Sequence, residues 1–308
     1  MLTIHDFHTP PRVTDSDLRN PLCRENKVWR VIPTAQLVNG CGHSFSRQED
    51  VTGILDDIAR AVGPPTAMCV LGSNVIGAAD WEQIPFAKQY QAVTTGAAAF
   101  VASNMLYLRV KGPDAAAVLN MLTPRNVHKL SRDCAMFALF TTPAGTVDEE
   151  AIVLRTGHEE YLVSCGGGKP PSYLPDALKV YPRASVEQSD FVSFNLKGPQ
   201  RIKAMETLVR CQDRPQVASL QPFQACAVQT PDGKPIWVLR TLVGIEMWGN
   251  APVIRTVWDT ILNNSALVDV AAGLAEEAAA TRQLLGSPNQ LEAITAQFEG
   301  RAPDFRDT

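Results

Sequence analysis

The chain has 308 residues, of which 45% are hydrophobic and 19% charged, and its formal net charge is −4. This composition predicts a soluble globular protein of one large or two ordinary domains. The chain has no lysine- or arginine-rich block and no apolar run of about 18 residues, which argues against nucleic-acid binding and membrane insertion. Its first residues lack the basic and apolar stretches of a signal peptide, so we expect a cytoplasmic protein.

The cysteines and histidines indicate no metal site. Seven cysteines are scattered without a C-x-x-C pair, and no two histidines have the H-x-x-x-H spacing. The pattern is typical neither of a disulfide framework nor of a zinc site.

Residues 1–75 are expected to form an N-terminal extension that contains a small α/β element. Residues 1–30 are polar and weakly patterned, which favours an irregular arm. The next segments predict a strand, an amphipathic helix ended by Gly63-Pro64-Pro65, and a buried strand. Their ranges are Lys27–Val38, Asp50–Val62 and Ala67–Leu71.

Residues 76–286 are predicted to form the core of the protein, and residues 287–308 a polar tail. Helices are expected at Ile84–Thr95, near Tyr173–Val180, and at Val253–Asn263 and Ala271–Leu285. Strands are expected at Ala97–Val101, Ala135–Phe140, Ala151–Arg155, Tyr161–Ser164, Ala225–Gln229 and Ile236–Thr241.

One sequence unit occurs twice, as YLRVKGPDAAAVLNML at Tyr107–Leu122 and SFNLKGPQRIKAMETL at Ser193–Leu208. Each copy reads as an alternating strand, Lys-Gly-Pro and an amphipathic helix. The glycine allows a sharp exit from the strand, and the proline sets φ at a helix start, where its missing N–H costs nothing. The two copies predict an α+β fold with a pseudo-duplicated core and a pocket between its halves.

Two acidic segments are candidates for chemistry. Asp148-Glu149-Glu150 directly precedes the strand AIVL. Since only alternate residues share a face of a strand, one carboxylate could be buried as an acid or base, or all three could lie in a solvated turn. Glu246 interrupts the apolar strand IEMWG. It needs a partner, such as the N–H edge of a pterin or guanine, unless its strand lies at a sheet edge in water.

Two loops are weaker candidates. The segment GCGHSFSRQED places His43 near Arg47 and two serines, which suits anion binding, proton transfer or a polar surface loop. The run Cys165-Gly-Gly-Gly-Lys169 resembles an anion nest but lacks the spacing of a phosphate loop, so a flexible connector is the better interpretation.

Several ordered motifs resemble the T-protein (aminomethyltransferase) superfamily of the glycine cleavage system. They are AFVASNMLYLRVKGPDAAAVLNMLTPRNV, AGTVDEEAIVLRTGHEEYLV, FNLKGPQRIKAME and PFQACAV, within residues 74–285. LRTLVGIEMWG, followed by VIRTVWDTIL, is most similar to the tetrahydrofolate-dependent vanillate and syringate O-demethylases. The resemblance implies a T-protein-like folate-binding fold and passage of a one-carbon group to N5 of tetrahydrofolate.

The resemblance also implies roles for individual residues. Glu246 matches the carboxylate that grips the pterin edge, and Lys197 and Asn195 flank the second Lys-Gly-Pro turn, where relatives place a polar side chain near the pterin. Glu150 falls close to the reacting centre of the family, together with Asn104.

The substrate implied by the resemblance is a small, methoxylated aromatic acid. Arg47 and Trp248 are its expected contacts, and no nucleic acid or membrane partner is expected.

The chain also departs from the family pattern. Asn104 stands where the demethylases have a histidine, and Cys165 replaces a segment that carries Arg or Asn in relatives. The residues before position 75 are unmatched, and we expect no C-terminal barrel of the family in the residues up to Thr308.

These departures leave two alternatives open. One is a cofactor-independent lyase or decarboxylase, in which His43, Arg47 and the carboxylates perform acid–base work on an aromatic acid in the former folate cavity. The other is a non-catalytic folate-binding protein. A homodimer is also expected, because the apolar face that the barrel covers in relatives must be buried by a second copy or have its apolar residues replaced.

Overall fold

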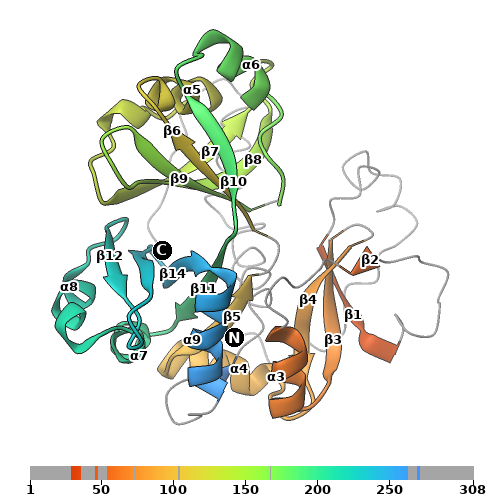
Figure 1. Ribbon diagram of the computed structural model, residues 1–308. Helices are drawn as coiled ribbons and strands as arrows, with labels where there is room; N and C mark the ends of the chain where they lie inside the picture. The colour runs from red at the N-terminus through yellow and green to blue at the C-terminus, as the bar shows by residue number, and fades with distance from the viewer. Residues whose placement is uncertain are drawn as a thin grey trace, which may run out of the picture.

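The structure is a computed structural model that describes residues 29–35, 46–47, 54–71, 74–102, 105–166, 168–262 and 269–270. Within these residues helices combine with three β-sheets, none of which closes into a barrel (Figure 1). The predicted mixture of helices and sheets is therefore confirmed. Residues 1–28 of the arm predicted at 1–30, the helix at 271–285 and the tail at 287–308 lie outside the described residues, while residues 29–30 of that arm belong to a strand.

A four-stranded sheet precedes the first repeat, with the strand order β1-β3-β4-β2. Its elements are β1 (Trp29–Pro33), β2 (Ser46–Arg47), α3 (Ile54–Val62), β3 (Pro65–Leu71) and β4 (Asn74–Trp81). Gly63 ends α3 with φ 81°, a backbone conformation that a side chain disfavours, as the Gly-Pro-Pro sequence predicts. Strand β4 was not predicted, although it pairs with β3 along its length.

The first repeat belongs to a five-stranded sheet with the order β10-β6-β9-β8-β7. Its elements are β6 (Leu106–Lys111), α5 (Ala115–Leu122), η3 (Val127–Lys129), β7 (Cys134–Thr141), β8 (Val147–Arg155), β9 (Glu160–Cys165), α6 (Leu174–Val180) and β10 (Ser185–Ser189). Helices α5 and α6 cover one face of this sheet, at the top of Figure 1. The meander β7-β8-β9 and helix α6 confirm the prediction, whereas the exposed strand β10 was missed.

The second repeat belongs to a six-stranded sheet with the order β12-β13-β14-β11-β5-β15. Its strands are β5 (Ala98–Ala102), β11 (Phe191–Lys197), β12 (Ala225–Gln229), β13 (Pro235–Arg240), β14 (Gly244–Asn250) and β15 (Asp269–Val270). The helices around it are α4 (Phe86–Thr95), α7 (Arg201–Thr207), η4 (Cys211–Asp213), α8 (Arg214–Ser219) and α9 (Ala251–Leu262).

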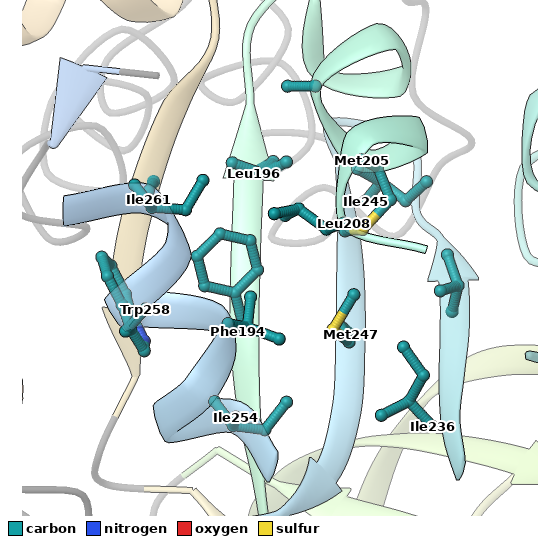
Figure 2. Close-up of a cluster of buried hydrophobic side chains, with 14 of the residues drawn as sticks. Phe194, Leu196, Met205, Leu208, Ile236, Ile245, Met247, Ile254, Trp258 and Ile261 are labelled. Atoms are coloured by element: carbon teal, nitrogen blue, oxygen red, sulfur yellow. The ribbon is translucent and has the colours of Figure 1, made fainter. Parts of the chain in front are cut away.

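One face of the six-stranded sheet is buried against helices α7 and α9. Figure 2 shows Phe194 of β11 and Met247 of β14 pointing toward Trp258 and Ile254 of α9 and Met205 of α7. Phe194 and Trp258 meet edge to face, with ring centroids 5.0 Å apart. Because this face is filled by apolar side chains, alternate residues of β11 and β14 must present their side chains on the opposite face.

Both Lys-Gly-Pro units fold as predicted, as β6 followed by α5 and β11 followed by α7. Gly112 and Gly198 have φ of 109° and 100°. A Cβ atom on Gly112 would lie 2.2 Å from the carbonyl oxygen of Arg183, and one on Gly198 would lie 2.5 Å from that of Gly96. Each turn therefore needs glycine both for its backbone conformation and for the close approach of a second segment.

A small apolar cluster joins the five-stranded and six-stranded sheets. It contains Tyr107, Ile152 and Leu154 from the first and Leu239 and Trp248 from the second. No helix in the described part of the chain is long and apolar enough to cross a membrane.

Candidate functional site

Glu246 lies in an interior strand of the six-stranded sheet. Strand β14 pairs with β13 on one side and with β11 on the other, so the alternative of an edge strand is wrong. The neighbours Ile245 and Met247 are fully buried on the helix-covered face, whereas Glu246 is half-buried on the opposite face. The carboxylate thus occurs in the middle of a sheet, where it must be matched by polar groups.

Trp248 supplies one of these polar groups. It lies on the same face of β14, two residues after Glu246, and its Nε1–H donates a 2.8 Å hydrogen bond to Oε2 of Glu246. The indole is fully buried. A buried indole N–H that donates to a carboxylate restricts the rotation of both side chains. Trp248 was expected to contact a substrate, and its burial favours a role in orienting Glu246.

Asn195 and Lys197 of β11 share this face with Glu246. Asn195 is the direct cross-strand partner of Glu246. Its Nδ2 donates to Oγ of Ser193 over 3.3 Å, while its buried Oδ1 accepts no hydrogen bond from the described residues. The Nζ of Lys197 lies 4.9 Å above the ring of Phe100, a cation–π contact. The structure therefore brings together the three residues that were predicted to bind the cofactor.

Tyr107 of the five-stranded sheet contacts this group through Trp248. The two rings meet edge to face at 5.3 Å between centroids. Burial and, next, the charge of Glu246 raise the pKa of the Tyr107 hydroxyl far above its ordinary value, while the Ser193 and Ser164 hydroxyls lower it by less. Although these serines lie near the Tyr107 hydroxyl, none of the described side chains meets it with hydrogen-bonding geometry.

Three residues near Trp248 were not predicted from the sequence as site residues: Tyr107, Ser164 and Ser193. A tyrosine in an alternating strand is normally part of the core, and Tyr107 follows that pattern. The two serines could have indicated a polar group in the core, because they interrupt apolar strands and a buried hydroxyl needs a hydrogen-bond partner.

The carboxylates 148–150 belong to strand β8 and not to a solvated turn. Glu149 is buried, and its Oε1 accepts a hydrogen bond from the backbone N–H of Glu150. Glu150 is exposed and shares a face with Ile152 and Leu154, the face that packs toward Trp248. Glu150 lies in a different sheet from Glu246, and a joint role of the two stays a prediction.

The other predicted residues lie outside the described part or are placed only as backbone. His43 and Asn104 are outside the described residues. Arg47 belongs to β2, which pairs in parallel with β4. Their predicted roles in catalysis and substrate binding are therefore untested.

The buried cysteines are poor candidates for nucleophiles. Burial first, and then the charge of Glu149, raise the pKa of the Cys165 thiol to about 12. Burial likewise raises the pKa of Cys226 to about 12. The thiolate is the nucleophilic form of cysteine, and a raised pKa keeps the thiol protonated. Neither side chain is therefore suited to covalent catalysis. Among the described residues no group of three or more His, Cys, Asp or Glu side chains is placed to hold a metal ion.

Comparison with known proteins gives a family match over most of the chain. The model of the GCVT N-terminal domain matches residues 74–281. The aminomethyltransferase of Koribacter versatilis is 26% identical over 125 residues, which cover 39% of this chain and 33% of that protein. The heme-dependent oxidative N-demethylase gamma subunit of Ectopseudomonas mendocina is 24% identical over 193 residues, 61% of this chain and 50% of that protein.

A solved structure shows the same fold. The glycine cleavage system aminomethyltransferase T from Bartonella henselae superimposes with a TM-score of 0.61 at 15% sequence identity, covering 75% of this chain and 61% of that one. The chain spans half or less of the length of the two curated relatives above.

Proposed function

This chain belongs to the GCVT N-terminal domain family, and we propose that it binds tetrahydrofolate as the acceptor of a one-carbon group. The observation that carries the proposal is the half-buried Glu246 carboxylate on an interior strand, oriented by the Trp248 indole. A carboxylate held in this way suits a flat ligand edge with two N–H donors, because it can accept both hydrogen bonds at once.

The neighbouring residues fit the pterin ring of this cofactor. The Oδ1 of Asn195, which accepts no hydrogen bond from the described residues, is an acceptor on the strand next to Glu246. The amino and ring N–H groups of a pterin are donors, so they complement both residues. Lys197, on the same face, contributes positive charge toward the negatively charged glutamate tail of a folate. When bound, tetrahydrofolate supplies N5 as the amine that accepts the one-carbon group.

As the donor we propose a small methoxylated aromatic acid, on the similarity of the IEMWG segment to the O-demethylase branch. Glu150 and Asn104 are proposed to line the reacting centre and Arg47 to contact the acid, while acid–base work by His43 belongs to the cofactor-independent alternative. The names of the relatives favour a second candidate, a one-carbon group carried on nitrogen, since they are an aminomethyltransferase and an N-demethylase subunit.

Calorimetry with tetrahydrofolate tests the binding step. Glu246→Gln keeps the shape of the side chain and an acceptor for the Trp248 indole but removes the charge. Losing one charge-assisted pairing is expected to weaken binding about 10- to 100-fold. Glu159→Gln, an exposed carboxylate at the β8–β9 turn, is the matched control and is expected to bind as the wild type does.

The outcomes separate the alternatives. No binding to the wild type, or equal binding by the Glu246→Gln variant, contradicts the proposal. Release of a phenol from a methoxylated benzoate only when tetrahydrofolate is present supports the first donor, and the same dependence with an N-methyl amino acid supports the second. Turnover of an aromatic acid without folate, lost in His43→Ala, supports the cofactor-independent lyase instead.

A further inference from the structure

Two buried aromatic rings in contact with each other connect the carboxylate of Glu246 to the five-stranded sheet. The Nε1–H of Trp248 holds Oε2 of Glu246 at 2.8 Å. The other side of the indole meets Tyr107, with the ring planes inclined by 73°. Trp248 is fully buried and Tyr107 is 1% exposed, so neither ring can turn without disturbing the other.

This contact lies in the apolar cluster that joins the five-stranded and six-stranded sheets. Tyr107 lies on β6, where its neighbour on β9 is Ser164. Trp248 lies on β14, where its neighbour on β11 is Ser193. The five-stranded sheet therefore presses one aromatic side chain against the residue that orients Glu246.

The ring of Tyr107 carries this contact, and its hydroxyl does not. The hydroxyl is buried and makes no hydrogen bond with the described residues, as is also the case for Oγ of Ser164. Removing this hydroxyl costs little, because its contacts with the Ser193 and Ser164 hydroxyls lack hydrogen-bonding geometry. Removing an aromatic ring from a packed edge-to-face pair, by contrast, opens space beside the indole.

We propose that Tyr107 is a positioning residue for Glu246, acting through Trp248. The inference rests on the proposed function, since it assigns Tyr107 to the orientation of the ligand-gripping carboxylate. Without the ring of Tyr107 the indole gains rotational freedom, the N–H···O bond loosens, and the carboxylate no longer presents two oxygens in a fixed direction.

Three variants test this inference in the whole 308-residue chain. Tyr107→Leu removes the ring and is expected to bind tetrahydrofolate about tenfold more weakly, the size of change that one lost aromatic contact produces. Tyr107→Phe retains the ring and is expected to bind within about twofold of the wild type. Val153→Ala destabilises the five-stranded sheet from the opposite, helix-covered face of β8 and is expected to leave binding unchanged, which controls for loss of stability.

A spectroscopic measurement makes the test independent of folate. The indole N–H resonance of Trp248 is assigned in ¹⁵N-labelled protein by its absence in Trp248→Phe. In Tyr107→Leu it is expected to shift and to exchange faster with solvent, and in Tyr107→Phe to stay near its wild-type position.

The results distinguish failure of this inference from failure of the proposed function. If the wild type binds tetrahydrofolate and Glu246→Gln weakens it, equal binding by Tyr107→Leu overturns the inference alone. If the wild type does not bind, the proposed function fails, and an unchanged Trp248 resonance in Tyr107→Leu overturns the inference as well. Faster exchange of the Trp248 indole N–H in Tyr107→Leu supports the positioning of Trp248 by Tyr107 in either case, whereas a shift alone can come from the lost ring current of the tyrosine.

Discussion

At the scale of single residues, the three carboxylates at the start of β8 occupy three different environments. Asp148 accepts hydrogen bonds from the backbone N–H of Ser172 and from Lys169, Glu149 is buried, and Glu150 is exposed. Partial burial raises the pKa of Asp148, but the contacts with Ser172 and Lys169 together outweigh it and lower the pKa. Residue type alone does not distinguish these positions, because the difference arises from the alternation of β8 and from a loop that is distant in sequence.

The contacts of Asp148 predict a pH dependence of stability. A carboxyl whose pKa is lower in the folded than in the unfolded state stabilises the fold above the unfolded pKa, and this contribution is lost as pH falls through the folded pKa. Asp148→Asn is therefore expected to be less stable than the wild type at pH 7 and to lose less stability on acidification. Urea unfolding at pH 7, 5 and 3 measures both effects. If the stability of the two proteins falls equally on acidification, the pKa of Asp148 is not lowered in the folded protein.

At the scale of elements, local pattern was sufficient for most of the fold. Both Lys-Gly-Pro units, the β7-β8-β9 meander and helices α3, α4, α6 and α9 were predicted from periodicity and turn residues. Strand β10 was missed because its residues, SVEQS, are polar and mostly exposed at the edge of the sheet. An edge strand of this kind has no apolar alternation to detect, and pairing with β6 alone makes it a strand.

The crowded surroundings of Gly198 in the second Lys-Gly-Pro turn predict that an added Cβ atom destabilises the fold. Gly198→Ala is expected to lower the free energy of unfolding by about 2–4 kcal/mol, because the Cβ meets backbone oxygens in addition to the unfavourable φ. Gly145→Ala is the matched control, since Gly145 has φ 80° and nothing within 4 Å of the added atom.

The control variant is expected to lose only about 1–2 kcal/mol, the backbone cost of a left-handed residue. Urea unfolding followed by circular dichroism compares the two proteins. Equal losses of stability would show that the close approach of Gly96 does not matter.

At the scale of the whole molecule, the segment before the repeats shares its hydrophobic core with the second half of the chain. Ile58 of α3 and Trp81 of β4 belong to the same buried cluster as Phe194 and Trp258. Arg255 of α9 also forms an ion pair with Asp57 of α3. The predicted division at residue 75 stays a prediction, and these contacts predict that α3 and β4 unfold together with the six-stranded sheet.

A substitution in α3 tests this shared core. Ile58→Ala is expected to destabilise the protein by about 2–4 kcal/mol, because it leaves a cavity in a fully buried site. Tryptophan fluorescence and far-ultraviolet circular dichroism are expected to report the same urea midpoint. Leu242→Ala at the exposed β13–β14 turn is the control and should change stability by less than about 0.5 kcal/mol. Two separate transitions, of which Ile58→Ala shifts only one, would mean that the segment before the repeats folds independently.

The sequence by itself determined the local units of this protein, namely the alternating strands, the glycine-proline turns and the amphipathic helices, because each depends on residues that are close along the chain. It also marked Glu246 as an unusual carboxylate in an apolar strand. Only the tertiary structure decided that this strand is interior, that Trp248 and Asn195 border the carboxylate, and that Tyr107 contacts Trp248 from another sheet. Strand order and contacts between sheets depend on residues far apart in the chain, and the period of a single strand carries no information about them.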